Sequence, residues 1–91
     1  LVAVCWSDWI DTTRSGDSVS ATSSGADCMT HLYIEARTVN TKIPALDTGE
    51  TFDNFNPSDG FLCKDADQGS GKTCSDYEVR FGCSCTDYYM Y

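Results

Sequence analysis

Residues 74–85 read CSDYEVRFGCSC, and this stretch decides the fold class. Apolar and polar residues alternate over residues 77–85, which is the two-residue period of a β-strand with one buried face. The face expected to be buried carries, in order, Tyr77, Val79, Phe81, Cys83 and Cys85, and the opposite face carries Glu78, Arg80, Gly82 and Ser84. Two cysteines on one face can reach different partners on neighbouring elements, whereas a bond between them would be strained in an extended strand.

Other segments rich in β-branched and aromatic residues predict strands at residues 2–6, 51–55 and 61–64, and the longest candidate strand at residues 29–39. Within residues 29–39 we expect Leu32, Ile34 and Ala36 to share one face. Segments rich in Gly, Asp, Ser and Pro predict loops at residues 11–25, 40–50 and 65–72. We therefore expect one domain over residues 1–91, all-β and loop-rich, resembling a small β-sandwich stapled by disulfides.

Composition narrows the class of protein. The chain has 91 residues, and a core of this size gives limited stability, which six cysteines in disulfides would supplement. Oxidised cysteines imply a secreted, extracellular protein, and with no leader segment in view we expect a mature form or an excised module. The net charge of −8 disfavours nucleic acid and anionic membranes as partners, and no segment suits membrane insertion.

Catalytic chemistry has little support in this sequence. A single histidine, His31, has no serine or cysteine motif beside it, so we expect no enzyme and place His31 at the surface or in a satisfied hydrogen bond. A Cys-x-x-Cys pair is absent from the sequence, which disfavours zinc.

Five motifs in a fixed order resemble one known family. They are CWSDWID at residues 5–11, GD at 16–17, IEAR at 34–37, GFLCKDADQ at 60–68 and CSDYEVRFGC at 74–83. This set is similar to the WxxW, or CysD, domain, the cysteine-rich module of gel-forming mucins that also occurs in cartilage intermediate layer proteins. Mucin members carry a cysteine where Ala36 stands and another just before residue 60, and the loss of both leaves no orphan thiol.

The resemblance implies a disulfide pairing. Cartilage-type members look like this chain without Cys5 and Cys85, which implies the bridge Cys5–Cys85. The remaining pairs are then Cys63–Cys74, across a Gly-rich loop, and Cys28–Cys83. Cross-pairing of Cys63 and Cys74 with the other two cysteines is the alternative.

The resemblance also implies calcium as a cofactor. Mucin modules have a calcium ion near the positions of Asp11, Asp17 and Asp76, and Asp65 with Asp67 form a weaker second cluster. Family members usually have an acidic residue at the position of Val19, whose side chain supplies no ligand. The alternative is a solvated acidic surface.

Trp6 and Trp9 form the pattern that accepts C-mannosylation in the secretory pathway, and the resemblance implies Trp6 as the acceptor. We expect both indoles to be buried, with Arg80 stacked on them by cation–π contact. Aromatic residues in excess of a small core favour surface contacts; they are Tyr33, Tyr77, Tyr88, Tyr89, Tyr91, Phe52 and Phe55.

The resemblance implies a non-enzymatic module that makes weak contacts with other extracellular proteins or glycans in mucus or matrix, self-association included. A stand-alone carbohydrate-binding or defence protein is the alternative.

Overall fold

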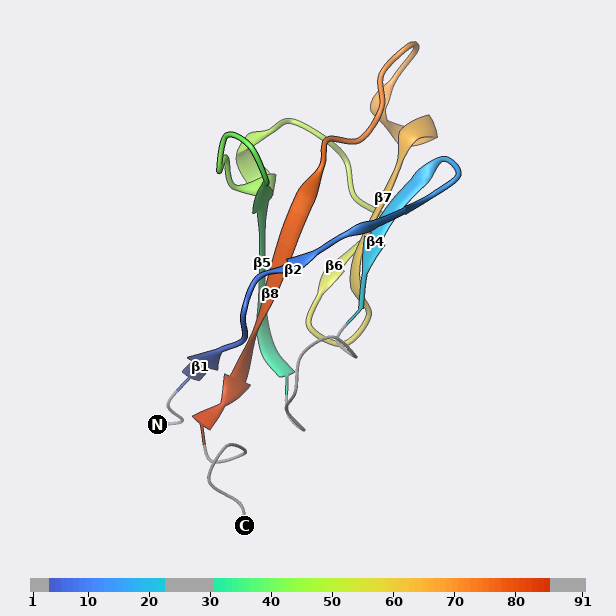
Figure 1. Ribbon diagram of the computed structural model, residues 1–91. Coiled ribbons are helices and arrows are strands. Elements are labelled where there is room, and N and C mark those ends of the chain that lie inside the picture. Colours follow the sequence, from blue (N-terminus) through green and yellow to red (C-terminus); the bar gives the residue numbers. More distant parts are fainter. Residues whose placement is uncertain (1–3, 23–30, 86–91) are drawn as a thin grey trace.

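The computed structural model describes residues 4–22 and 31–85, and it is an all-β sandwich of two antiparallel sheets (Figure 1). The first sheet is built around β8, which pairs with β5 on one side and with β1 and then β2 on the other. Its strands are β1 (Val4–Trp6), β2 (Ile10–Asp11), β5 (His31–Thr38) and β8 (Tyr77–Ser84). The predicted fold class is confirmed.

The second sheet has the strand order β3-β4-β7-β6. Its strands are β3 (Thr13–Ser15), β4 (Ser18–Ala21), β6 (Asn54–Asn56) and β7 (Gly60–Lys64). Two short 3₁₀ helices complete the described chain, η2 (Ala45–Asp47) and η3 (Asp65–Gln68). None of the helices in residues 4–22 and 31–85 has the length and apolar character needed to cross a membrane.

The prediction of a loop over residues 11–25 is wrong for residues 13–21, because β3 and β4 form a hairpin there, while residues 23–25 lie outside the described part of the chain. Its serine and threonine content reads as loop, yet β4 is a central strand that pairs with β7. Gly16 has φ of 62° at the first central position of the turn, a conformation that glycine adopts without strain. The strand expected at residues 51–55 is displaced to β6, where Phe55 pairs with Phe61.

The core lies between the two sheets. From the first sheet come Ala36, Tyr77, Val79 and Phe81, and from the second Val19, Phe61 and Cys63. The rings of Phe52, Phe55, Phe61 and Tyr77 contact one another at centroid distances of 5.0–5.7 Å. Three of the aromatic residues predicted as surplus, Tyr77, Phe52 and Phe55, therefore serve the core, and burial raises the pKa of Tyr77 to about 12. Residues 88–91 lie outside the described part of the chain.

Candidate functional site

Trp6 and Trp9 lie on the same face of the first sheet although they are three residues apart. The reason is one extra residue between β1 and β2 in their pairing with β8. Trp6 pairs with Gly82, and Ile10 pairs with Val79, so four steps on one side face three on β8. In a regular strand residues three apart point to opposite faces, and a one-residue bulge corrects this parity. Ser7 fills the gap, since its N–H donates to the carbonyl of Phe81 and its Oγ accepts from the N–H of Phe81.

Both indoles lie against arginine side chains from the first sheet. The Arg37 Cζ is 3.9 Å from the centroid of the Trp9 ring, and the Arg80 Cζ is 4.7 Å from Trp9 and 4.6 Å from Trp6. Beyond Trp6 the ring of Tyr33 follows at 6.5 Å. We call this series the Trp–Arg stack; in order its members are Arg37, Trp9, Arg80, Trp6 and Tyr33.

The stack confirms the expected contact of Arg80 with the indoles but corrects their expected burial. Trp6 is 38% exposed and Trp9 is only partly buried, and Tyr33 beside Trp6 is 55% exposed. The indoles cover the outer face of β8, which explains why this strand is buried on both faces rather than on one. Gly82 is required beneath Trp6, because a Cβ there would lie 2.9 Å from Val4 and 3.3 Å from the indole.

Carboxylates fix the guanidinium groups of the stack. Arg80 bonds to Glu35 at 2.7 Å, and Arg37 bonds to Glu78 at 2.5 Å. Lys42 joins Glu78 at 3.0 Å. Lys42 and then Arg37 hold the pKa of Glu78 below its ordinary value of 4.5. The cations are thus immobilised on a sheet rather than free on long side chains.

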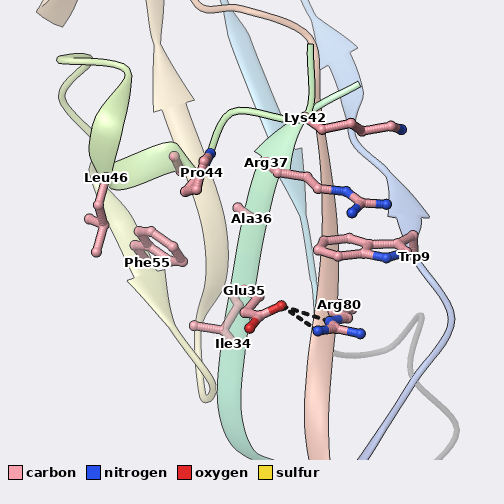
Figure 2. A pocket seen from close by; sticks show the side chains of 11 residues that line it. Trp9, Ile34, Glu35, Ala36, Arg37, Lys42, Pro44, Leu46, Phe55 and Arg80 are labelled. Atoms are coloured by element: carbon pink, nitrogen blue, oxygen red, sulfur yellow. Dashed lines mark hydrogen bonds and ion pairs between the residues drawn. The ribbon is translucent and has the colours of Figure 1, made fainter. Parts of the chain in front are cut away.

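A groove runs beside the stack along the outer edge of β5 (Figure 2). It has a volume of about 360 Å³. Pro44, Leu46 and Phe55 form an apolar wall on one side of β5, and Trp9 with the basic side chains lies on the other. Because residues 34–37 all line it, and neighbours in a strand point to opposite faces, the groove follows the strand edge. We call it the β5 groove.

Arg14 lies in a second charged region, at the end of the second sheet. Its guanidinium bonds to Asp65 at 2.7 and 3.3 Å and to the carbonyl of Cys74 at 3.2 Å. Asp65 also accepts the N–H of Cys74, and the two contacts, that of Arg14 first, lower the pKa of Asp65. Asp65 and then Asp17 and Asp76 raise the pKa of Arg14. We call Arg14 and these three aspartates the acidic corner.

The expected calcium ligands do not gather into one carboxylate cluster in the described part of the chain. Asp11, Asp17 and Asp76 lie on β2, in the β3–β4 turn and before β8, and within the described residues they do not form a metal-ligand cluster. The cavity beside Arg14 has one carboxylate in its lining, that of Asp76, whereas calcium takes about six to eight oxygens. Val19 is a buried residue of β4 in the same lining. Calcium therefore stays a prediction from the family resemblance.

The weaker pair is also separated, because Asp67 faces Asp53 rather than Asp65. Hydrogen bonding with Asp53 raises the pKa of Asp67, and Lys64 lowers that of Asp53. Lys64 contacts Asp53 at 2.9 Å. The Asp53–Asp67 pair therefore already has a cation from the protein, that of Lys64.

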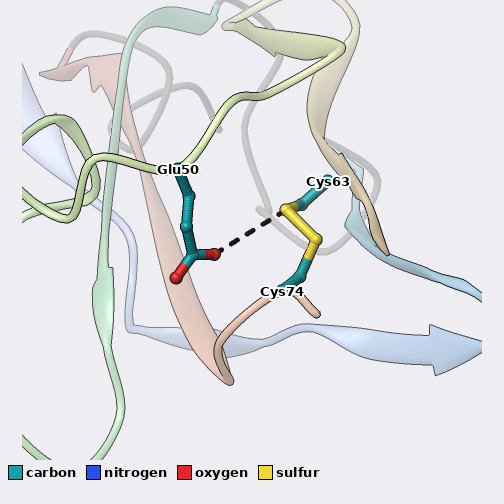
Figure 3. Close-up of side chains that lie close together, drawn as sticks. All are labelled: Glu50, Cys63 and Cys74. Carbon is teal, nitrogen blue, oxygen red and sulfur yellow. Dashed lines mark hydrogen bonds between the residues drawn. A yellow bond between two sulfur atoms is a disulfide. The ribbon is translucent and has the colours of Figure 1, made fainter. Parts of the chain in front are cut away.

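Glu50, Cys63 and Cys74 lie close together, with potential metal-ligand atoms within 4.8 Å of one another (Figure 3). Cys63 and Cys74 are joined by a disulfide with an S–S distance of 2.04 Å, so neither offers a thiolate to a metal. Glu50 instead bonds to Ser75, accepting from both its N–H and its hydroxyl. The cluster is structural: it holds the chain before β8 against the loop before β6.

The structure pairs Cys5 with Cys85 at 2.05 Å and Cys63 with Cys74, two of the bridges that the resemblance implies. Cys83 is disulfide-bonded, but Cys28 lies outside the described residues. The cross-pairing alternative is excluded by Cys63–Cys74.

His31 differs from its expected setting. Its ring meets Phe81 edge-on at 5.6 Å, and its Nε2 is buried without a hydrogen-bond partner in the part of the chain that the structure describes. A bulge of β5 between His31 and Tyr33 places the His31 ring against Phe81, and no sequence pattern predicts this bulge.

Comparison with known families identifies the chain by its sequence. A family model described as the mucin-2 protein WxxW repeating region matches residues 6–83. The chain belongs to this WxxW family. The match contains both tryptophans and both arginines of the stack, and it ends at Cys83. Among curated proteins, none matches this WxxW domain significantly.

Proposed function

We propose that this WxxW domain is a secreted, non-enzymatic contact module that makes weak, reversible bonds with other components of mucus or matrix. The supporting observation is the joined surface of the Trp–Arg stack and the β5 groove. Three of the six basic residues of the chain line this groove. Glu35 pairs with Arg80, and Glu78 pairs with both Arg37 and Lys42, so these three cations exceed their two carboxylate partners. On a chain of net charge −8, such a surface attracts acidic partners while the rest repels them.

Diffusion in a mucin gel tests this function. The labelled domain should recover after photobleaching more slowly than an inert acidic protein of the same size. Leu46→Asp should restore fast recovery, because Leu46 is 79% exposed and lines the groove. Ile43→Asp is the matched control, since it adds the same charge in the same β5–β6 connection, at an exposed side chain outside the groove lining. Equal recovery of the wild-type domain and the inert protein would contradict the proposal.

Modification of Trp6 by a C-linked hexose is part of the proposal. The Trp-x-x-Trp spacing and the 38% exposure of Trp6 support it, because a sugar there would lie on an exposed ring next to Tyr33, the last member of the stack. Intact mass of the domain secreted from cells should show one added hexose that Trp6→Phe abolishes. An unmodified mass for the wild-type chain would reject the modification.

Carbohydrate binding is the second candidate. The exposed rings of Trp6 and Tyr33, at 6.5 Å, suit stacking against a sugar. A glycan array should then give signals that Tyr33→Ala removes, whereas signals unchanged in that variant would argue against a site on these rings.

A further inference from the structure

Among residues 4–22 and 31–85, the outer edge of β5 has backbone groups that no other strand pairs. The Thr38 N–H donates outward to the carbonyl of Ile43, while the Val39 N–H donates to Asp76 on the β8 side. Because strand backbone groups alternate in direction, the N–H groups of Ala36 and Ile34 face the same outer edge as that of Thr38. In the described chain, the bridge between Arg37 and Pro44 is the pairing on this edge, and towards the start of β5 no strand follows it.

The side chains around this edge suit one kind of occupant. Leu46, 79% exposed, and the partly buried Phe55 offer apolar contact on one side. Arg37, Lys42 and Arg80 lie on the other, where these three cations exceed their two partners Glu35 and Glu78 and leave net positive charge. A strand added to an edge presents alternate side chains to opposite sides, so apolar residues would meet the first wall and acidic residues the second.

We propose that the β5 groove binds an extended acidic peptide segment of another extracellular protein, which adds a strand to the outer edge of β5. The proposal rests on the contact function above and names the partner. Exposed edges are templates for pairing, and the charge of the groove selects an acidic strand against the remaining peptides of a secretion.

Amide hydrogen exchange with a synthetic probe tests the strand addition. The probe is an end-blocked heptapeptide of alternating aspartate and valine with a central leucine. At about ten times its Kd, exchange at Ile34 and Ala36 should slow about tenfold, while Tyr33 and Glu35, whose N–H groups face β8, should not change. The same heptapeptide with backbone N-methyl groups on its pairing edge should not bind.

Two further comparisons test the groove itself. Leu46→Asp should weaken the heptapeptide about tenfold, and Ile43→Asp should not. An analogue with lysine in place of aspartate should bind at least about tenfold more weakly. The proposal would be overturned if the lysine analogue bound equally well, or if the heptapeptide protected amides elsewhere in the domain. It would also be overturned if rising protein concentration alone protected Ile34 and Ala36, because the occupant would then be a second copy of the domain.

The two levels of inference fail separately. Slow recovery in the mucin gel with no heptapeptide binding would reject the added strand and keep the contact function. Fast recovery in the gel with normal heptapeptide binding would reject the contact function in mucus and keep the site.

Discussion

The Trp–Arg stack and the acidic corner both contain ion pairs between arginine and a carboxylate, but the arginines have different surroundings. In the stack, Arg37 and Arg80 bond to glutamates and also lie over indole rings, and their side chains are 32% and 29% exposed. In the corner, Arg14 has oxygen partners and is 44% exposed. Stacking turns mobile cations into a fixed surface, whereas the corner neutralises local acids and ties η3 to the β3–β4 hairpin.

Loss of the Cys63–Cys74 bridge should lower the stability of the domain more than any of the substitutions that follow. The structural change should be confined to the acidic corner, where Cys74 contacts Arg14 and Asp65. Replacing both with alanine should lower the free energy of unfolding by about 3 kcal/mol, because the bridge restricts the unfolded chain. Urea unfolding measures the loss, and tryptophan fluorescence of the folded variant should be unchanged. Altered fluorescence would show that the stack depends on the corner.

Gly82→Val should damage the stack directly. The added Cβ would meet Val4, Tyr33 and Trp6 at 2.9–3.3 Å, and overpacking of this kind costs about 1–3 kcal/mol. Trp6 should also become more accessible to acrylamide quenching. Normal quenching with normal stability would show that Trp6 does not lie across Gly82.

Arg80→Met should cost about 1–2 kcal/mol, since it removes cation–π contacts to two indoles and the bond to Glu35. Arg80→Lys tests the planar group, because a lysine keeps the charge without stacking equally on both rings. Arg14→Met, the matched change in the corner, should lower the unfolding midpoint less. A larger loss for Arg14→Met would reverse the comparison.

The pKa of Glu78 predicts how the stack responds to acid. A carboxylate with a lowered folded pKa stabilises the protein above its ordinary pKa of 4.5, and that stability is lost as the pH falls through the folded pKa. The urea concentration at the unfolding midpoint should therefore decrease as the pH drops below about 4.5, and Glu78→Gln should make this decrease shallower. An equal decline in the variant would assign the acid sensitivity to other groups, Asp65 among them.

Calcium should have the smallest effect. Because the acidic corner holds its own cation, melting of the wild-type domain should be the same in calcium and in EDTA. A calcium-dependent rise in the midpoint would show that this domain binds the ion that its family resemblance implies.

The sequence predicted the elements whose pattern is strong and local. Residues 77–85 alternate clearly, and β8 is the strand that organises the first sheet. The β3–β4 hairpin was missed because serine and threonine in a central strand resemble a loop. The stack was only partly foreseen, since a bulge that changes the parity of Trp6 and Trp9 depends on pairing with β8, which composition does not reveal. The opposition of Asp53 and Asp67 likewise arises from distant segments.

The most direct test of the account is the NMR chemical shift of the Arg80 side-chain protons. A guanidinium between two indoles lies in their ring currents, so the Arg80 δ-protons should move strongly upfield of ordinary values and show contacts to both Trp6 and Trp9. Ordinary shifts without those contacts would mean that the stack does not form in solution.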